Sequence, residues 1–185
     1  MYILIIAILA LAVAGVILYN RLIRSRNRVD TAWSDIDVQL QRRYDLIPNL
    51  VKAVDQYASY ERATLEAVTE LRAQAKRVTD VEQRGRVEAE LGAGIQRLLA
   101  LAENYPDLKA NENFLNLQNE LVETEDYLQF ARRYFNGSVR DYNTMTETVP
   151  SRFIASAFGF EPRVYFQKSS DDVAHVPMVN LGSVE

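Results

Sequence analysis

Residues 114–145 read FLNLQNELVETEDYLQFARRYFNGSVRDYNTM, and apolar or small side chains recur along this stretch every seven positions. One row contains Phe114, Leu121, Leu128, Phe135 and Tyr142, and a second row contains Leu117, Thr124, Ala131, Ser138 and Met145. Two rows at heptad spacing share one side of a long helix, which must pack against other helices. The stretch therefore predicts an all-α fold, an up-and-down, four-helix-like antiparallel bundle of long helices.

The residues on the N-terminal side continue the helical pattern. An apolar stripe begins after residue 30, with spacings of three or four and one step of seven between Ala58 and Leu65. Its members are Trp33, Ile36, Leu40, Tyr44, Ile47, Val51, Val54, Ala58, Leu65, Val68, Leu71 and Ala75. Pro48 interrupts the stripe, and the residue before a proline is biased away from helix. Asp45 can cap a new helix there. Either two helices meet near residues 45–48, or one long helix kinks at Pro48, and in both cases helix is expected to reach Ala75.

The remaining elements follow from capping residues and prolines. Thr79 or Asp80 can cap a helix that ends at Tyr105-Pro106, and Asn111 can cap the heptad helix. Gly92 and Gly94 weaken the helix after residue 80, so we expect them where helices pack closely. Ser151 can cap a short amphipathic helix that carries Phe153, Ile154, Ala157 and Phe158. Residues 164–166 form an extended aromatic segment, and residues 167–185 are expected to be a disordered tail.

The N-terminal end of the chain is a candidate membrane anchor. Tyr2 to Tyr19 are eighteen uncharged residues, about 27 Å long as a helix, close to the thickness of a bilayer core. A cleaved signal peptide is the alternative, but no positive residue precedes the apolar run. The expected domains are therefore a transmembrane anchor (1–20), a basic collar (21–29), a helical bundle (30–166) and the tail (167–185).

The collar predicts the orientation of the anchor. It contains Arg21, Arg24, Arg26 and Arg28, which precede every acidic residue of the chain. Arginines next to a membrane helix stay on the cytoplasmic side, so we expect an outside N-terminus and a cytoplasmic C-terminal domain. The same arginines are candidate contacts to anionic lipid headgroups of the bilayer.

Composition excludes several classes of function. The sequence has no cysteine and one histidine, His175, so thiolate catalysis, cysteine-ligated metals and multi-histidine metal sites are excluded. Beyond the collar lie 17 basic and 25 acidic residues, a balance that argues against nucleic acid as a partner. No nucleotide loop is present. We expect no catalytic, metal or cofactor-binding residue and therefore a protein that is not an enzyme.

Polar and aromatic side chains provide the candidate interaction sites. A polar cluster is expected where the bundle brings two stretches together, with Asp45 paired to an arginine: Arg42, Arg43, Asp45, Asn49, Arg132, Arg133 and Asn136. Such a cluster is either a staple that fixes helix register or a site for a ligand or partner. Aromatic residues, expected to be exposed, offer a second surface: Tyr57, Tyr60, Tyr127, Tyr134, Tyr142, Tyr165 and Phe166.

Several long motifs resemble one family. They include AWSDIDVQL at 32–40, RRYDLIPNLV at 42–51, ENYPDLKAN at 103–111, Ala131-Arg132-Arg133 with Asn136, and the segment from Pro150-Ser151 to Phe160. In these motifs the chain closely resembles the LemA family, from the apolar segment to about Phe166. The resemblance implies a single-pass protein of the bacterial inner membrane with a cytoplasmic helical bundle, and it implies no enzymatic activity or cofactor.

The anchor, the bundle and the resemblance together lead to one principal hypothesis. We expect a membrane-anchored, non-enzymatic scaffold or adaptor that presents its bundle to other proteins and can self-assemble into a homo-oligomer. The alternatives are a regulatory partner of a membrane protease or envelope process and a membrane-remodelling protein. The resemblance connects relatives with magnetosome membranes and with a membrane zinc protease of the HtpX type, which makes such a protease a candidate partner.

Overall fold

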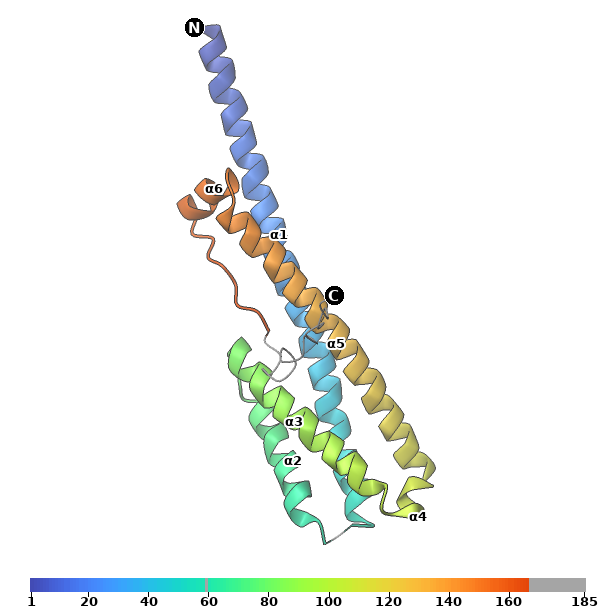
Figure 1. The fold of residues 1–185 in the computed structure, drawn as a ribbon. Helices are drawn as coiled ribbons and strands as arrows, with labels where there is room; N and C mark the ends of the chain where they lie inside the picture. The colour runs from blue at the N-terminus through green and yellow to red at the C-terminus, as the bar shows by residue number, and fades with distance from the viewer. Residues whose placement is uncertain (59, 167–185) are drawn as a thin grey trace, which may run out of the picture.

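The computed structural model describes residues 1–58 and 60–166, which form an elongated helical structure (Figure 1). Its helices are α1 (Tyr2–Asp55), α2 (Arg62–Ala75), α3 (Val81–Ala102), α4 (Pro106–Lys109), α5 (Glu112–Glu147) and α6 (Ser151–Ala157), and these described residues contain no strand. The predicted all-α class is confirmed. The tail expected at 167–185, with His175, lies outside the described residues.

The four long helices alternate in direction. α1 packs mainly along α5, and α2 packs mainly along α3. The α2–α3 hairpin lies beside the end of α1 that is farthest from the N-terminus (Figure 1). The single turn of α4 connects α3 to α5 at this same end. The first turns of α1 project beyond every other helix, so the molecule is a bundle with a protruding apolar rod.

The heptad rows of α5 face the core as expected. Phe114, Leu121, Leu128, Phe135 and Tyr142 are all buried, and in the second row Thr124, Ala131 and Ser138 are buried while Leu117 and Met145 are half-buried. The facing stripe of α1 is also buried, at Ile36, Leu40, Tyr44, Ile47, Leu50 and Val54. Each large apolar side chain buried in this way contributes about 1.5–3 kcal/mol, so the α1–α5 pair forms the main axis of the core.

Two of the expected caps are present. The Asp80 carboxylate accepts a hydrogen bond from the Gln83 backbone N–H at 2.8 Å, and Asn111 Oδ1 accepts from Asn113 N and Phe114 N at 3.0 and 3.2 Å. The expected cap at Ser151 is wrong, because Ser151 is the first residue of α6 and donates its hydroxyl to the Thr148 carbonyl at 3.0 Å. Gly94 confirms close packing, since a Cβ there would lie 3.0 Å from Val68 Cγ2.

Pro48 lies inside one continuous helix, so two helices do not meet at residues 45–48. A proline has no N–H, and the carbonyl four residues earlier therefore loses its helical donor. That carbonyl belongs to Tyr44, and Arg72 Nε of α2 donates to it at 2.6 Å. A side chain from the neighbouring helix thus replaces the hydrogen bond that Pro48 removes.

Replacing Arg72 by Met should destabilise the protein by about 1–3 kcal/mol, because the Tyr44 carbonyl is then left without a donor. The cost should largely disappear when Pro48 is also replaced by Ala, which restores the helical N–H. The check is a double-mutant cycle on the full chain in detergent micelles, followed by chemical unfolding. Additive effects of the two substitutions would show that Arg72 does not compensate for Pro48.

The expected helix from Pro48 to Ala75 is wrong in its length. α1 ends at Asp55 and α2 begins at Arg62. The stripe runs across the turn without interruption because Val54, Ala58 and Leu65 all enter the same core. The spacing of the apolar residues therefore did not reveal that one helix ends at Asp55 and another begins at Arg62. The break between the two helices includes Tyr57 and Tyr60, and tyrosine favours helix less than leucine or lysine does.

Beyond α6 the chain turns back along the bundle. Gly159 has a φ of 68°, a left-handed conformation that glycine adopts without strain and that commonly ends a helix. Residues 161–166, which we name the C-terminal strap, then run along α5 toward the start of α3 (Figure 1). Two asparagines of α5 hold the strap, as described next.

Asn143 and Asn136 each make a pair of hydrogen bonds with the strap backbone. Asn143 Nδ2 donates to the Arg163 carbonyl at 2.9 Å, and its Oδ1 accepts from Arg163 N at 2.8 Å. Asn136 makes the same pair with Phe166, at 3.0 and 2.9 Å. The two asparagines are seven residues apart and so lie on one side of α5. The two side-chain amides thus make the hydrogen bonds to the strap backbone that a neighbouring strand would make in a sheet.

Replacing Asn136 by Ala should release the strap locally, with faster hydrogen exchange at the Phe166 amide. Replacing Asn143 by Ala should do the same at the Arg163 amide, and each variant serves as the control for the other. Each variant removes both hydrogen bonds of its pair, so at about 1 kcal/mol per bond we expect exchange to rise by about thirtyfold. Unchanged exchange at both amides would mean that the asparagines do not hold the strap.

Candidate functional site

The most buried polar group of the bundle centres on Arg43. Its guanidinium contacts the Glu88 carboxylate, donates to the Glu88 carbonyl at 3.2 Å, and donates to Glu125 Oε2 at 2.9 Å. The Tyr44 hydroxyl donates to the other oxygen of Glu88, and Arg132 lies 3.8 Å from Glu125. We name these five residues the Arg43 network. Because they come from α1, α3 and α5, one polar cluster joins three helices.

The centre of the network is removed from water, whereas the side chains of Glu125 and Arg132 at its edge are 34% and 19% exposed. The side chains of Arg43 and Glu88 are 3% and 0% exposed. Burial, with the adjacent Glu88 carboxylate, raises the pKa of Tyr44 above its ordinary value, so the phenol stays protonated and donates. Burial also lowers the pKa of Arg132, although Glu125 opposes this change. The positive charge of Arg43 is thus balanced by the carboxylates of Glu88 and Glu125.

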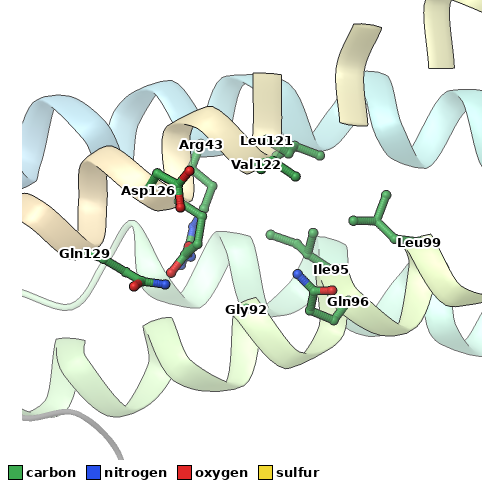
Figure 2. A pocket seen from close by; sticks show the side chains of 10 residues that line it. Arg43, Gly92, Ile95, Gln96, Leu99, Leu121, Val122, Asp126 and Gln129 are labelled. Atoms are coloured by element: carbon green, nitrogen blue, oxygen red, sulfur yellow. The ribbon is translucent and has the colours of Figure 1, made fainter. Parts of the chain in front are cut away.

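A cleft of about 310 Å³ lies next to the network, between α3 and α5 (Figure 2). Arg43 reaches into it from α1, Ile95 and Leu121 form an apolar side, and Gln96 and Gln129 bring amides. The Arg43 charge is already matched by Glu88 and Glu125. The cleft therefore lacks the uncompensated cation that an anionic ligand would need.

The structure brings only part of the predicted polar cluster together. Arg43 and Arg132 join the network, while Arg42 forms a separate, exposed ion pair with Glu123 at 3.3 Å. Asp45 does not pair with an arginine or begin a helix. It lies within α1 and accepts from Gln41 Nε2 at 2.7 Å.

The other three residues of that cluster lie apart from the network. Asn49 and Arg133 are exposed on α1 and α5. Asn136 holds the strap through its amide.

Sequence reasoning missed Glu88, Glu125 and Tyr44 as members of the network. A signal for Glu88 was present, because it stands three residues before Leu91 and seven before Ile95, in the buried stripe of α3. A charged residue at such a position requires a buried partner of opposite charge. Glu125 gave no comparable signal, since it lies among the other carboxylates of α5.

A second candidate site is an apolar groove on the outer side of the α1–α5 pair. It has a volume of about 220 Å³ and is lined by Val38 of α1 and by Tyr127, Phe130 and Tyr134 of α5. We name these four residues the aromatic groove. Their side chains are between 48% and 64% exposed, and the three on α5 share one side of that helix. They form a mainly apolar surface, with Asp35 and Gln39 of α1 also in its lining, that no described residue covers.

The expectation of exposed aromatics holds for five of the seven residues named from the sequence: Tyr57, Tyr60, Tyr127, Tyr134 and Tyr165 are exposed. It is wrong for Tyr142 and Phe166, which are 1% and 3% exposed. Tyr142 belongs to a heptad row of α5. The Phe166 ring lies 5.8 Å from that of Trp33 and beneath the Arg132 guanidinium at 5.1 Å. Both therefore pack inside the bundle.

Comparison with protein families matches residues 32–181 to the LemA family model. The match includes all of α5, the part of α1 that lines the aromatic groove, and all five residues of the Arg43 network. The chain belongs to the LemA family. The resemblance noted in its sequence motifs is thereby confirmed.

Individual relatives of this LemA-family chain are distant. It is 24% identical over 176 residues to Magnetosome protein MamQ 1 of Paramagnetospirillum magneticum and to Magnetosome protein MamQ of Magnetospirillum gryphiswaldense. Each match covers 81% of this chain and 65% of the relative. The chain is also 25% identical over 155 residues to Protein LemA of Metamycoplasma hominis, with 81% of this chain and 69% of that protein covered. The chain thus spans slightly less than two thirds of the MamQ proteins.

The apolar N-terminal part of α1 and the LemA-family relatives fit a membrane protein. This part of α1 is long and apolar enough to cross a bilayer, and residues 1–14 are all exposed. Of the collar, Arg21, Arg24 and Arg28 are exposed, whereas Arg26 is half-buried with its guanidinium 5.4 Å from the Phe160 ring centre. α1 passes through the collar without a break, so anchor and bundle share one helix.

Proposed function

We propose that this protein is a membrane-anchored, non-enzymatic scaffold or adaptor that binds a helix of another protein in its aromatic groove. The observation that carries the proposal is the groove itself, with Tyr127, Phe130 and Tyr134 exposed along one side of α5 beside Val38 of α1. Aromatic residues are enriched at protein interfaces. A stripe of this spacing accommodates the apolar face of an amphipathic helix.

The orientation follows from the collar. Four arginines directly after the apolar segment favour an N-terminus outside the cell and a bundle in the cytoplasm, at the inner membrane of a bacterium. A reporter fused after Glu185 tests this arrangement. Activity of a cytoplasmic reporter, such as green fluorescent protein, is expected, and activity of fused alkaline phosphatase would contradict it.

In this proposal the Arg43 network has a structural role. It fixes the register of α1, α3 and α5 and so keeps the two sides of the groove aligned. The support is that Arg43 and Glu88 are buried and compensate each other. A ligand site would instead require a charge left free to bind.

The test of the groove is photo-crosslinking in native membranes. A photoreactive phenylalanine analogue at position 130 should give a crosslinked product above the mass of the monomer. The matched control places the analogue at position 122, because Val122 is 53% exposed on the same helix but lines the other cleft. Products of equal yield at both positions, or none at position 130, would contradict the proposal.

Mass spectrometry of the product then identifies the occupant. A second copy of this chain would mean a self-assembling scaffold, and a different protein would mean an adaptor. A membrane protease in the product would support the regulatory alternative. The variant Tyr127→Glu/Tyr134→Glu should abolish the product, because it places two charges in the groove while both positions remain exposed and accessible to water.

A further inference from the structure

α6 lies beside the end of the membrane anchor. The Cδ1 atom of Ile154 would lie 3.9 Å from a Cβ at Gly15. The Tyr19 ring is 4.9 Å from that of Phe158 and 5.7 Å from that of Phe160. Figure 1 shows α6 next to α1 at the point where the protruding rod reaches the bundle. α6, Phe158 and Phe160 are therefore level with residues 15–19 of the anchor.

The length of the anchor places this level at the edge of the bilayer core. Residues 2–14 span only about 20 Å as a helix, whereas the hydrocarbon core is about 30 Å thick. A helix that spans the core must therefore include residues 15–19, and Arg21 is the first charged residue after them. Because α6 packs against these same residues, a spanning anchor brings α6 to the boundary between hydrocarbon and headgroups.

The exposed side chains of this region suit that boundary. Phe153 and Phe158 are 68% and 63% exposed, and Val149, in the turn before α6, is 70% exposed. Ile154 and Ala155 face the bundle instead. One exposed phenylalanine within the seven residues of α6 and a second directly after the helix are costly in water but favourable in the interfacial region. Arg152, Arg21 and Arg24 are exposed nearby and can contact anionic headgroups.

We propose that α6 is a second membrane contact, in which Phe153, Phe158 and Val149 insert into the leaflet on the bundle side of the membrane. The bilayer is the occupant that the structure favours, because these side chains continue the lipid-facing apolar surface of α1 at the same level. The bundle would then be fixed to the membrane at two points. This inference depends on the anchor and is independent of whether the aromatic groove binds a partner.

Site-directed spin labelling of the full chain in liposomes of phosphatidylcholine and phosphatidylglycerol tests this proposal. The sequence has no cysteine, so Phe153→Cys and Phe158→Cys each carry one label. Labels at both positions should collide with oxygen, which concentrates in lipid, severalfold more often than with a water-soluble nickel complex. Leu4→Cys in the anchor is the lipid control, and Tyr60→Cys, 97% exposed at the far end of the bundle, is the water control.

Each result decides the question. Collision ratios at 153 and 158 that match the Tyr60 control would place α6 in water and overturn the proposal. Low collision rates with both reagents would mean that a second copy of the chain covers α6, which also overturns it. A water-like ratio at Leu4 would show that the anchor does not span the bilayer. α6 would then not lie at the boundary between hydrocarbon and headgroups, and this also overturns the proposal. The emission of Trp33 checks that each variant is folded.

Discussion

Replacing Glu88 by Gln should lower the free energy of unfolding by about 3 kcal/mol, because it leaves the buried charge of Arg43 undercompensated. Gln has nearly the same size as Glu, so the loss of stability reflects the missing charge rather than a change in packing. Glu88 is completely buried, and solvent therefore does not screen the change. The measurement is chemical unfolding of the full chain in detergent micelles, followed by far-ultraviolet circular dichroism.

The matched control is Glu123→Gln, which removes the exposed ion pair with Arg42. An exposed pair contributes less than about 1 kcal/mol. Equal losses for the two variants would contradict the role assigned to the network. The double variant Arg43→Met/Glu88→Leu should regain much of the stability, as apolar replacements of buried ion pairs often do. If it is stable but no longer crosslinks through position 130, the network is needed to keep the two sides of the aromatic groove aligned.

Replacing Phe135 by Ala should cost about 3–5 kcal/mol, the range for a buried aromatic residue that leaves a cavity. Phe135 is 3% exposed, and its ring lies 5.3 Å from that of Trp33. Trp33 is the only tryptophan of the chain. Its emission should therefore shift to longer wavelength as water enters, and the same unfolding measurement gives the free energy.

Phe130→Ala is the control on the same helix. Phe130 is 64% exposed, so its removal should change stability by no more than about 0.5 kcal/mol. A loss comparable to that of Phe135→Ala would mean that Phe130 is covered in solution, for example by a second copy of the chain. The pair of variants thus separates the core side of α5 from the groove side.

The main axis of the fold was predictable from sequence because its signal is periodic and local. The heptad rows of α5 and the stripe of α1 each need a helix with one buried side, and both are found as expected. The caps at Asp80 and Asn111 were predictable for the same reason, since each bonds to an N–H two or three residues away. Such contacts depend on neighbours in the chain.

The missed features depend on partners that are distant in sequence. The sequence left open whether Pro48 separates two helices or lies within one, and it lies within α1, where Arg72 supplies the absent hydrogen bond from another helix. Asn136 was predicted to belong to the polar cluster but does not, because its partner is the backbone of Phe166 rather than a side chain. Arg43 was correctly chosen as a candidate, yet its partners Glu88 and Glu125 lie on two other helices. Local pattern does not determine which of many carboxylates an arginine will reach.

The continuity of α1 couples the bilayer mechanically to the far end of the protein. Membrane helices change their tilt when bilayer thickness changes, and α1 contains no joint between its apolar turns and Asp55. The part from Arg21 to Asp55 is a lever arm of about 52 Å, so a 10° change in tilt displaces its tip by about 9 Å. In a spanning anchor with α6 free of the membrane, a change in bilayer thickness would move the α2–α3 hairpin laterally, whereas insertion of α6 would restrain this movement.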